Sequence, residues 1–113
     1  MAKSEGEIQV KNISILGVTG SIGTQALDVI RDAENEVRLV GVTAHRNFEK
    51  LVDIIEEFKP KYIGVTDSDC FGKVKEYCEK ANMNCELYSG EEALEKIATL
   101  EEVDTVLTSV VGI

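Results

Sequence analysis

Three glycines at intervals of three are the residues whose spacing points most directly to chemistry. Gly17, Gly20 and Gly23 follow an apolar run. An amphipathic helix is predicted to begin around Ile22. In a strand–turn–helix unit, the first glycine permits a tight turn, the second admits a ligand's phosphates, and the third lets helix and strand pack closely. The spacing predicts a nucleotide phosphate site. The alternative is an ordinary turn in a parallel α/β domain.

The start of the predicted helix supplies donors that suit an anion. Its first N–H groups have no intrahelical partner, and the positive end of the helix dipole lies there. Thr19 and Ser21 add hydroxyl groups. The candidate ligand-binding residues of this loop are Gly17, Thr19, Gly20, Ser21, Ile22 and Gly23.

A second candidate loop, residues 43–47, follows the predicted strand at 37–42. A site that selects NAD normally carries Asp or Glu at the end of its second strand, where the carboxylate accepts from the ribose hydroxyls. Along the chain no carboxylate occurs here before Glu49, which is expected inside the next helix. Arg46 instead offers a planar cation suited to a 2′-phosphate and to stacking on adenine. The alternative is that His45 and Arg46 are exposed loop residues without a ligand.

Predicted strands and helices alternate along the chain and position these loops. The strands are expected at residues 13–17, 37–42, 62–65, 85–88 and 103–111. The helices are expected at 22–33, after an N-cap at Asn47, after residues 67–69, and from a capping box of Ser89 and Glu92 to about Thr99. This alternation predicts an α/β fold: a Rossmann-like, doubly wound parallel sheet of about five strands in three layers, with helices on both faces. Loops 17–23, 43–47 and 109–113 would meet beyond the carboxyl ends of its strands.

Apolar periodicity predicts which helical residues face the core. For the helix at 22–33 these are Ile22, Ala26, Val29, Ile30 and Ala33. For the second helix they are Leu51, Ile54, Ile55 and Phe58, and for the third Phe71, Val74, Cys78 and Ala81. Residues 34–36 are expected to form a polar turn.

Composition narrows the class of protein. A length of 113 residues predicts one domain, and a net charge of −9 disfavours nucleic acid as a partner. No apolar run approaches the roughly 20 residues that span a membrane, and residues 1–7 lack the apolar core of a signal peptide. A cytoplasmic protein is expected. The three cysteines form no C-x-x-C pair and the sole histidine is distant, so free thiols are expected and no metal site.

Residues 15–25, I-L-G-V-T-G-S-I-G-T-Q, and residues 27–30, L-D-V-I, closely resemble the opening of 1-deoxy-D-xylulose 5-phosphate reductoisomerases. That family usually reads G-S-T-G-S-I-G-T-Q, and Val18 replaces its first serine. Ala44, Arg46 and Asn47 match the loop that contacts the adenosine ribose and 2′-phosphate in the family, whereas His45 replaces a frequent glycine. Residues 103–106 and 110–112 look like the family's V-D-x-V and I-V-G. The resemblance covers about residues 12–113.

The resemblance implies an NADPH-binding domain of an oxidoreductase. The family converts 1-deoxy-D-xylulose 5-phosphate to 2-C-methyl-D-erythritol 4-phosphate in the non-mevalonate pathway of isoprenoid biosynthesis. Its Mg²⁺ or Mn²⁺ is held by carboxylates of a separate central domain, and the full-length enzyme is expected to be a homodimer. The implied cofactor contacts are Gly17, Thr19, Gly20, Ser21, Ile22, Gly23, Ala44, His45, Arg46 and Asn47.

No catalytic residue or metal ligand is assigned within this sequence. Residues 1–11 are expected to be a flexible lead and residues 12–113 an incomplete NADPH-binding domain. The central catalytic and C-terminal helical domains are expected to be absent, so the chain alone should be inactive. One alternative is a stand-alone nucleotide-sensing Rossmann module. Another is a phosphate-accepting signalling domain, which would need an acidic cluster at the first and third strand ends, where only Asp67 is acidic.

Overall fold

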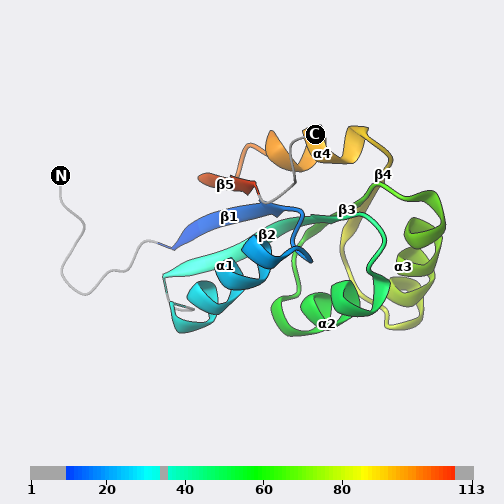
Figure 1. The fold of residues 1–113 in the computed structure, drawn as a ribbon, viewed down its shortest axis with the longest axis horizontal. Helices are drawn as coiled ribbons and strands as arrows, with labels where there is room; N and C mark the ends of the chain where they lie inside the picture. Colours follow the sequence, from blue (N-terminus) through cyan, green and yellow to red (C-terminus); the bar gives the residue numbers. More distant parts are fainter. Residues whose placement is uncertain (1–9, 34–35, 109–113) are drawn as a thin grey trace.

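A computed structural model of the chain describes residues 10–33 and 36–108. The described residues form five strands and four helices that alternate along the chain (Figure 1). The elements are β1 (Lys11–Leu16), α1 (Ser21–Asp32), β2 (Val37–Ala44), α2 (Phe48–Phe58), β3 (Tyr62–Val65), α3 (Ser68–Lys80), β4 (Glu86–Ser89), α4 (Glu92–Ala98) and β5 (Thr105–Thr108). Lys11, expected in the lead, is the first residue of β1.

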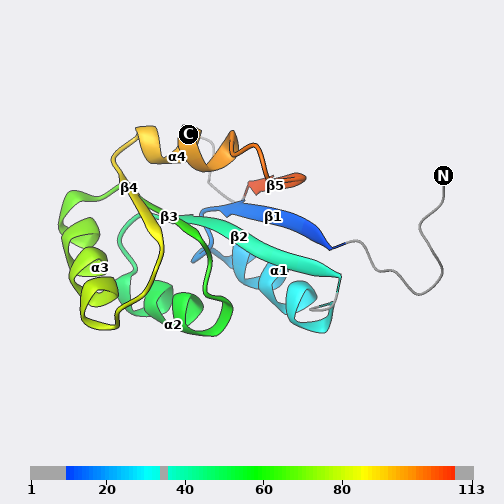
Figure 2. The ribbon, with the colours of Figure 1, turned by 180° about the vertical axis from the view of Figure 1, so that it is seen from behind.

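The five strands form one parallel sheet in the order β4-β3-β2-β1-β5. The chain moves outward from β1 to β4 and then crosses back to place β5 on the other side of β1. Parallel crossovers are right-handed, so this change of direction puts α4 on the opposite face from α1, α2 and α3. Figure 2 shows α4 above the sheet, between the edges formed by β4 and β5. The predicted doubly wound α/β fold is confirmed.

Each face of the sheet has its own hydrophobic core. The larger core lies under α1, α2 and α3 and includes Ile15, Leu27, Leu51, Ile63 and Val74. The smaller core lies under α4 and consists of Leu16, Val40, Tyr62 and Ile97. Successive strand residues point to opposite faces, which is why Ile15 and Leu16 belong to different cores.

The predicted inward face of α1 is wrong at two positions. Ile22 and Val29 are 61% and 67% exposed. Ile30 is buried as predicted, and the other buried residues of α1 are Gly23 and Leu27, so the buried positions are spaced at i, i+4 and i+7. Close packing of α1 at Gly23 turns that side of the helix toward the sheet and leaves Ile22 and Val29 outside.

Two further expectations are corrected around α3 and α4. In α3 the residue buried in the first turn is Cys70, whereas Phe71 is half-buried and Ala81 is exposed at the end of the helix. The capping box does not form, because Ser89 is the last residue of β4 and α4 begins at Glu92. Gly90 donates its N–H to the carbonyl of Val65, which keeps this segment aligned with the sheet beyond Ser89.

Other expectations agree with the structure where it describes them. Leu51, Ile54 and Ile55 are buried in α2, and Phe58 packs against the same core. Residues 34–35 of the predicted turn and residues 109–111 of the predicted fifth strand lie outside the described residues. None of the helices in the described ranges is both long and apolar enough to cross a membrane.

Candidate nucleotide-binding site

Gly17 turns the chain sharply at the end of β1 and has a φ of +78°. L-residues with a Cβ rarely adopt this left-handed backbone, so glycine suits the position. The carbonyl of Thr43 accepts the N–H groups of Gly17 and Val18 at 3.1 and 2.8 Å. The Thr43 hydroxyl also accepts from the Gly17 N–H at 2.8 Å. These two N–H groups therefore anchor the loop to β2 and are already engaged within the protein.

Gly23 lets α1 pack directly against the start of this loop. A Cβ at Gly23 would lie 2.7 Å from both the Gly17 and the Val18 carbonyl oxygens. Such a contact is closer than real Cβ atoms tolerate, and the neighbouring atoms are backbone atoms that cannot turn away. The steric role predicted for the third glycine is thus found in the structure.

The first turn of α1 presents backbone donors beyond the carboxyl end of β1. Thr24 donates the first intrahelical hydrogen bond, from its N–H to the Gly20 carbonyl at 2.9 Å. The N–H groups of Ser21, Ile22 and Gly23 precede that bond, and the positive end of the helix dipole lies with them. Gly20 has a φ of −76° and a ψ of 172°, which any residue can adopt. The backbone conformation therefore does not require glycine at this position.

The second candidate loop lies beside the glycine loop because Thr43, its first residue, accepts the N–H groups of Gly17 and Val18. Ala44 ends β2 with its side chain buried, and His45, Arg46 and Asn47 follow as exposed residues. The Asn47 side chain accepts from the Lys50 N–H at 3.2 Å, which confirms the predicted N-cap of α2. His45 Nδ1 lies 2.6 Å from the hydroxyl oxygen of Thr66.

Sequence reasoning missed one charged residue of this site, Asp67. Its carboxylate caps α3 by accepting the Cys70 N–H at 3.1 Å, and its Oδ1 lies 3.5 Å from Nε of Arg46. The Cys70 hydrogen bond, assisted by the charges of Arg46 and His45, holds the pKa of Asp67 below its usual range. A carboxylate thus stands at the second strand's end, although it comes from the third. The contact arises because β2 and β3 are parallel neighbours, so the residues that follow them meet.

The third predicted loop, residues 109–113, lies outside the described residues. The structure does show where it starts, since Thr108 of β5 pairs with Leu16 at the end of β1. β1 therefore lies between β2 and β5, where the direction in which successive strands are added to the sheet reverses, directly beside the glycine loop. In open α/β sheets such a switch point is where ligands bind.

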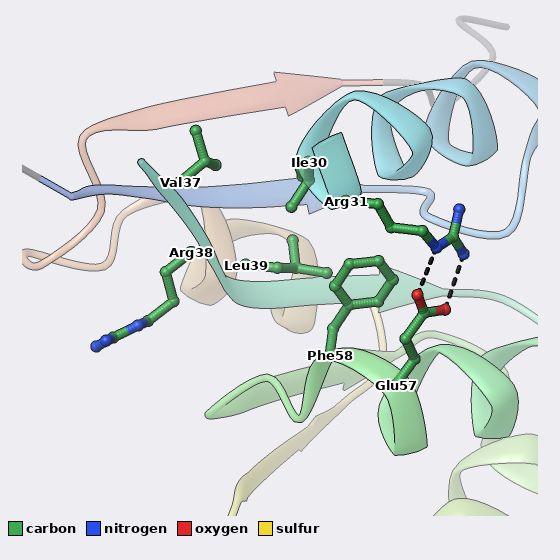
Figure 3. Close-up of a pocket in the computed structure, with 7 residues that line it drawn as sticks. All are labelled: Ile30, Arg31, Val37, Arg38, Leu39, Glu57 and Phe58. Carbon is green, nitrogen blue, oxygen red and sulfur yellow. Dashed lines mark hydrogen bonds and ion pairs between the residues drawn. The ribbon is translucent and has the colours of Figure 1, made fainter. Parts of the chain in front are cut away.

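A cavity of about 450 Å³ lies at the amino end of β2, away from these loops. Arg31 of α1 and Glu57 of α2 form a two-point ion pair at its rim, with Nη2 and Oε1 2.8 Å apart (Figure 3). The Arg31 guanidinium lies 5.3 Å from the ring centre of Phe58, and Arg38 projects away from the pair. These contacts join α1 to α2, and the cavity lies between these two helices and the start of β2.

No cluster of three or more His, Cys, Asp or Glu side chains within residues 10–33 and 36–108 could hold a metal ion. Cys70, Cys78 and Cys85 are all free thiols. The donor set of the described residues therefore does not fit the divalent cation that the resemblance implies for the complete enzyme.

The sheet order and the glycine loop define a Rossmann-like α/β domain. The sequence profile of the 1-deoxy-D-xylulose 5-phosphate reductoisomerase family matches residues 13–113. The chain belongs to this family.

Curated relatives support the assignment along most of the chain. The reductoisomerase of Clostridium botulinum (strain Alaska E43 / Type E3) is 57% identical over 103 residues, which are 91% of this chain and 27% of the relative. The reductoisomerase of Clostridium tetani is 53% identical over 103 residues, which are again 91% of this chain and 27% of the relative. The chain thus spans about a quarter of the length of the curated relatives that it matches.

Solved structures of the same family share the fold. A DOX-P reductoisomerase in complex with NADPH, fosmidomycin and magnesium superposes with a TM-score of 0.86 at 34% identity, covering 91% of this chain and 25% of that one. The reductoisomerase of Zymomonas mobilis in complex with NADPH gives a TM-score of 0.83 at 28% identity, covering 92% of this chain and 27% of that one.

Proposed function

We propose that this chain binds NADPH and forms the cofactor-binding part of a 1-deoxy-D-xylulose 5-phosphate reductoisomerase. The observation that carries the proposal is the double role of Thr43. Its carbonyl fixes the Gly17 and Val18 N–H groups, and Arg46 follows it by three positions. A phosphate-binding loop and a cation are thereby held side by side. A dinucleotide with a 2′-phosphate carries negative charge on its pyrophosphate and on its adenosine ribose. One such ligand would place the first group at the glycine loop and the second at Arg46.

Each loop takes a different part of the cofactor. The pyrophosphate accepts from the first N–H groups of α1, those of Ser21, Ile22 and Gly23, with the hydroxyls of Thr19 and Ser21 beside them. Gly20 lets the phosphates approach the backbone. Two observations support this assignment. A side chain at position 23 would clash with the backbone of the loop, and the backbone at position 20 has a conformation that does not itself require glycine.

The adenosine end is held by the second loop, Ala44 to Asn47. Ala44 is buried, so it acts through its backbone, while Arg46 meets the 2′-phosphate. Charge-assisted contacts between a guanidinium and a phosphate are stronger than neutral hydrogen bonds. Asn47 keeps the loop at the start of α2 by capping that helix. His45 is turned to Thr66 and stands as a secondary contact.

In a protein of the relatives' length, NADPH held here would reduce the intermediate derived from 1-deoxy-D-xylulose 5-phosphate, giving 2-C-methyl-D-erythritol 4-phosphate. We place substrate and Mg²⁺ or Mn²⁺ on parts beyond this chain, because the described residues offer no metal cluster. The proposal includes a cytoplasmic location and a homodimeric complete enzyme in the non-mevalonate pathway of isoprenoid biosynthesis. The bound NADPH of two related solved structures supports the cofactor assignment.

Titration of the isotope-labelled chain with the two halves of the cofactor tests this proposal. We expect 2′,5′-ADP to shift the backbone amide signals of residues 19–23 and 44–47 and to bind more tightly than nicotinamide mononucleotide. Amides of residues 57–59 and 61, before the amino end of β3, serve as the internal control and should stay in place. Tighter binding of nicotinamide mononucleotide, or shifts centred on residues 57–59 and 61, would contradict the proposed site.

A further inference from the structure

Two cysteines that the proposed function does not use lie side by side between α3 and β4. The Sγ atoms of Cys78 and Cys85 are 3.7 Å apart. Cys78 is buried in the larger core, and Cys85 is half-buried just before β4. At this distance the two sulfur atoms are in contact.

The backbone between the two cysteines holds them in this arrangement. After α3 the Met83 N–H donates to the Cys78 carbonyl at 2.9 Å, and the Asn82 N–H donates to the Glu79 carbonyl at 3.1 Å. Asn82 takes a left-handed φ of 55°, which reverses the chain toward β4. Asparagine tolerates that conformation better than most residues. The approach of the two thiols is therefore built into the turn.

The third cysteine cannot take the place of Cys85. Cys70 lies on the same helix as Cys78, eight positions earlier. At a rise of 1.5 Å per residue the two lie about 12 Å apart along the axis, well beyond disulfide reach. Cys70 therefore cannot replace Cys85 as the partner of Cys78, and Cys78 and Cys85 are the two thiols in contact.

The two thiols differ in how a reagent can reach them. Cys85 lines a cavity of about 410 Å³ whose wall includes Pro60, Asn82 and Asn84. A cavity of this size accommodates a small thiol compound. Cys78 is behind it in the core, and burial, followed by the hydrogen bond with Cys85, raises the pKa of Cys78 to about 12. Cys85 therefore meets the reagent first, and Cys78 reacts second.

We propose that Cys78 and Cys85 form a reactive dithiol that is converted to an intrachain disulfide by exchange with a low-molecular-weight disulfide. The Cys85 thiol loses its proton and the thiolate attacks one sulfur of the small disulfide, forming a mixed disulfide and releasing one small thiolate, which takes up that proton. Cys78 then gives up its proton and attacks the Cys85 sulfur, and the second small thiolate leaves and takes up that proton. The two protein thiols are oxidised by two electrons, and the small disulfide is reduced to two thiols.

Incubation of the chain with oxidised glutathione tests the proposal. The denatured product should contain one free thiol in place of the three of the reduced chain. Its intact mass should be lower by two hydrogen atoms, and peptide mapping should show Cys78 joined to Cys85. The oxidised chain should also melt several degrees higher, because the bond closes a loop in the unfolded state. The reaction should become faster as the pH rises, because Cys78 must lose its proton.

Three variants make the result specific. Cys70→Ser is the matched control and should form the same disulfide. Cys85→Ser, at the half-buried position, should form none. Cys78→Ala should stop at a stable glutathione adduct on Cys85. Retention of all three thiols in the wild-type chain, a wild-type product that stops at the glutathione adduct, a bond that includes Cys70, or a disulfide between two chains would each overturn the proposal.

Discussion

Nε of Arg46 lies 3.5 Å from Oδ1 of Asp67, so the cation that follows β2 is paired with a carboxylate that follows β3. The Arg46 side chain is 76% exposed, and exposed ion pairs of this kind are weak. A 2′-phosphate that approaches Arg46 would displace this pairing and would also meet the negative charge of Asp67. If Arg46 meets a 2′-phosphate as proposed, we expect the Asp67 carboxylate to weaken that contact.

The substitution Asp67→Asn should consequently strengthen binding of NADPH. The new side chain would still cap α3, because its amide oxygen can accept from the Cys70 N–H. Affinity for NADPH should rise roughly two- to fivefold, the range of a surface ion pair, with NADH affinity nearly unchanged. Isothermal titration calorimetry with both cofactors measures this, and Asp32→Asn, exposed at the opposite end of α1, controls for net charge. An equal change for NADH would contradict the interpretation.

Gly23→Ala should destabilise the fold although alanine favours helices. Its Cβ would lie 2.7 Å from two backbone oxygens, and relief of that clash costs about 1–3 kcal/mol. Gly72→Ala is the matched control, because Gly72 is also helical and no atom outside its own stretch of helix backbone lies within 4 Å of its added Cβ. That substitution should stabilise the chain by roughly 0.5–1 kcal/mol. Urea unfolding compares the two, and equal effects would show that α1 does not depend on contact at Gly23.

The architecture could be predicted from the sequence because the spacing of apolar residues distinguishes helices from strands. In α2 the apolar residues fall on one face only, and Leu51, Ile54 and Ile55 are buried as expected. In α1 the pattern was ambiguous, since Ile22 and Val29 have the same helical spacing as Gly23 and Ile30. The contact of Gly23 with the loop decided between these faces, and periodicity alone carries no information on that contact.

The loops of the candidate site and the edge of the sheet where they meet were predictable, but the side-chain contacts between them were not. The glycine spacing and Arg46 could be found along the chain, whereas the partners of both come from other strands. Thr43 and Asp67 act through the neighbour relations of β1, β2 and β3, which depend on strand order. The approach of Cys78 to Cys85 likewise depends on a turn whose course the sequence left open.

Tyr77 should make the stability of the chain depend on alkaline pH. Its hydroxyl donates to Glu56 Oε2 at 2.7 Å, linking α3 to α2. Burial, followed by this hydrogen bond, raises the pKa of Tyr77 to about 12, from about 10 in an unfolded chain. Below pH 10 the stabilising contribution is complete, and it is lost as the pH rises through the folded pKa, because only the unfolded state releases the proton easily.

Urea unfolding of Tyr77→Phe between pH 9 and pH 12 isolates this effect. Tyr62 and Tyr88 remain in both proteins, so the difference between the two pH profiles belongs to Tyr77. Stability of the wild-type chain should fall more steeply than that of the variant between about pH 10 and pH 12. Parallel profiles would show that the proton of Tyr77 is held no more firmly in the folded chain.

The chain alone should not convert 1-deoxy-D-xylulose 5-phosphate. It spans 27% of its Clostridium relatives, and its described residues provide no metal cluster. Loss of NADPH absorbance in the presence of the sugar phosphate and Mg²⁺ measures turnover, with the full-length Clostridium tetani reductoisomerase as the positive control. Turnover by the pure chain above the buffer rate would show that the substrate and metal residues have been placed wrongly.

The most direct test of the account is the cofactor preference of Arg46→Ala. Dissociation constants for NADPH and NADH should be measured for the wild-type chain, for Arg46→Ala, and for Arg38→Ala, which removes the same charge at the opposite edge of the sheet. We expect the wild-type chain and Arg38→Ala to prefer NADPH on the order of tenfold, the value of one exposed charge-assisted contact, and less at high salt. Arg46→Ala should lose most of that preference while its NADH affinity stays nearly unchanged. Equal loss of both cofactors in Arg46→Ala would show that Arg46 supports only the shape of the loop, and the 2′-phosphate site would be contradicted.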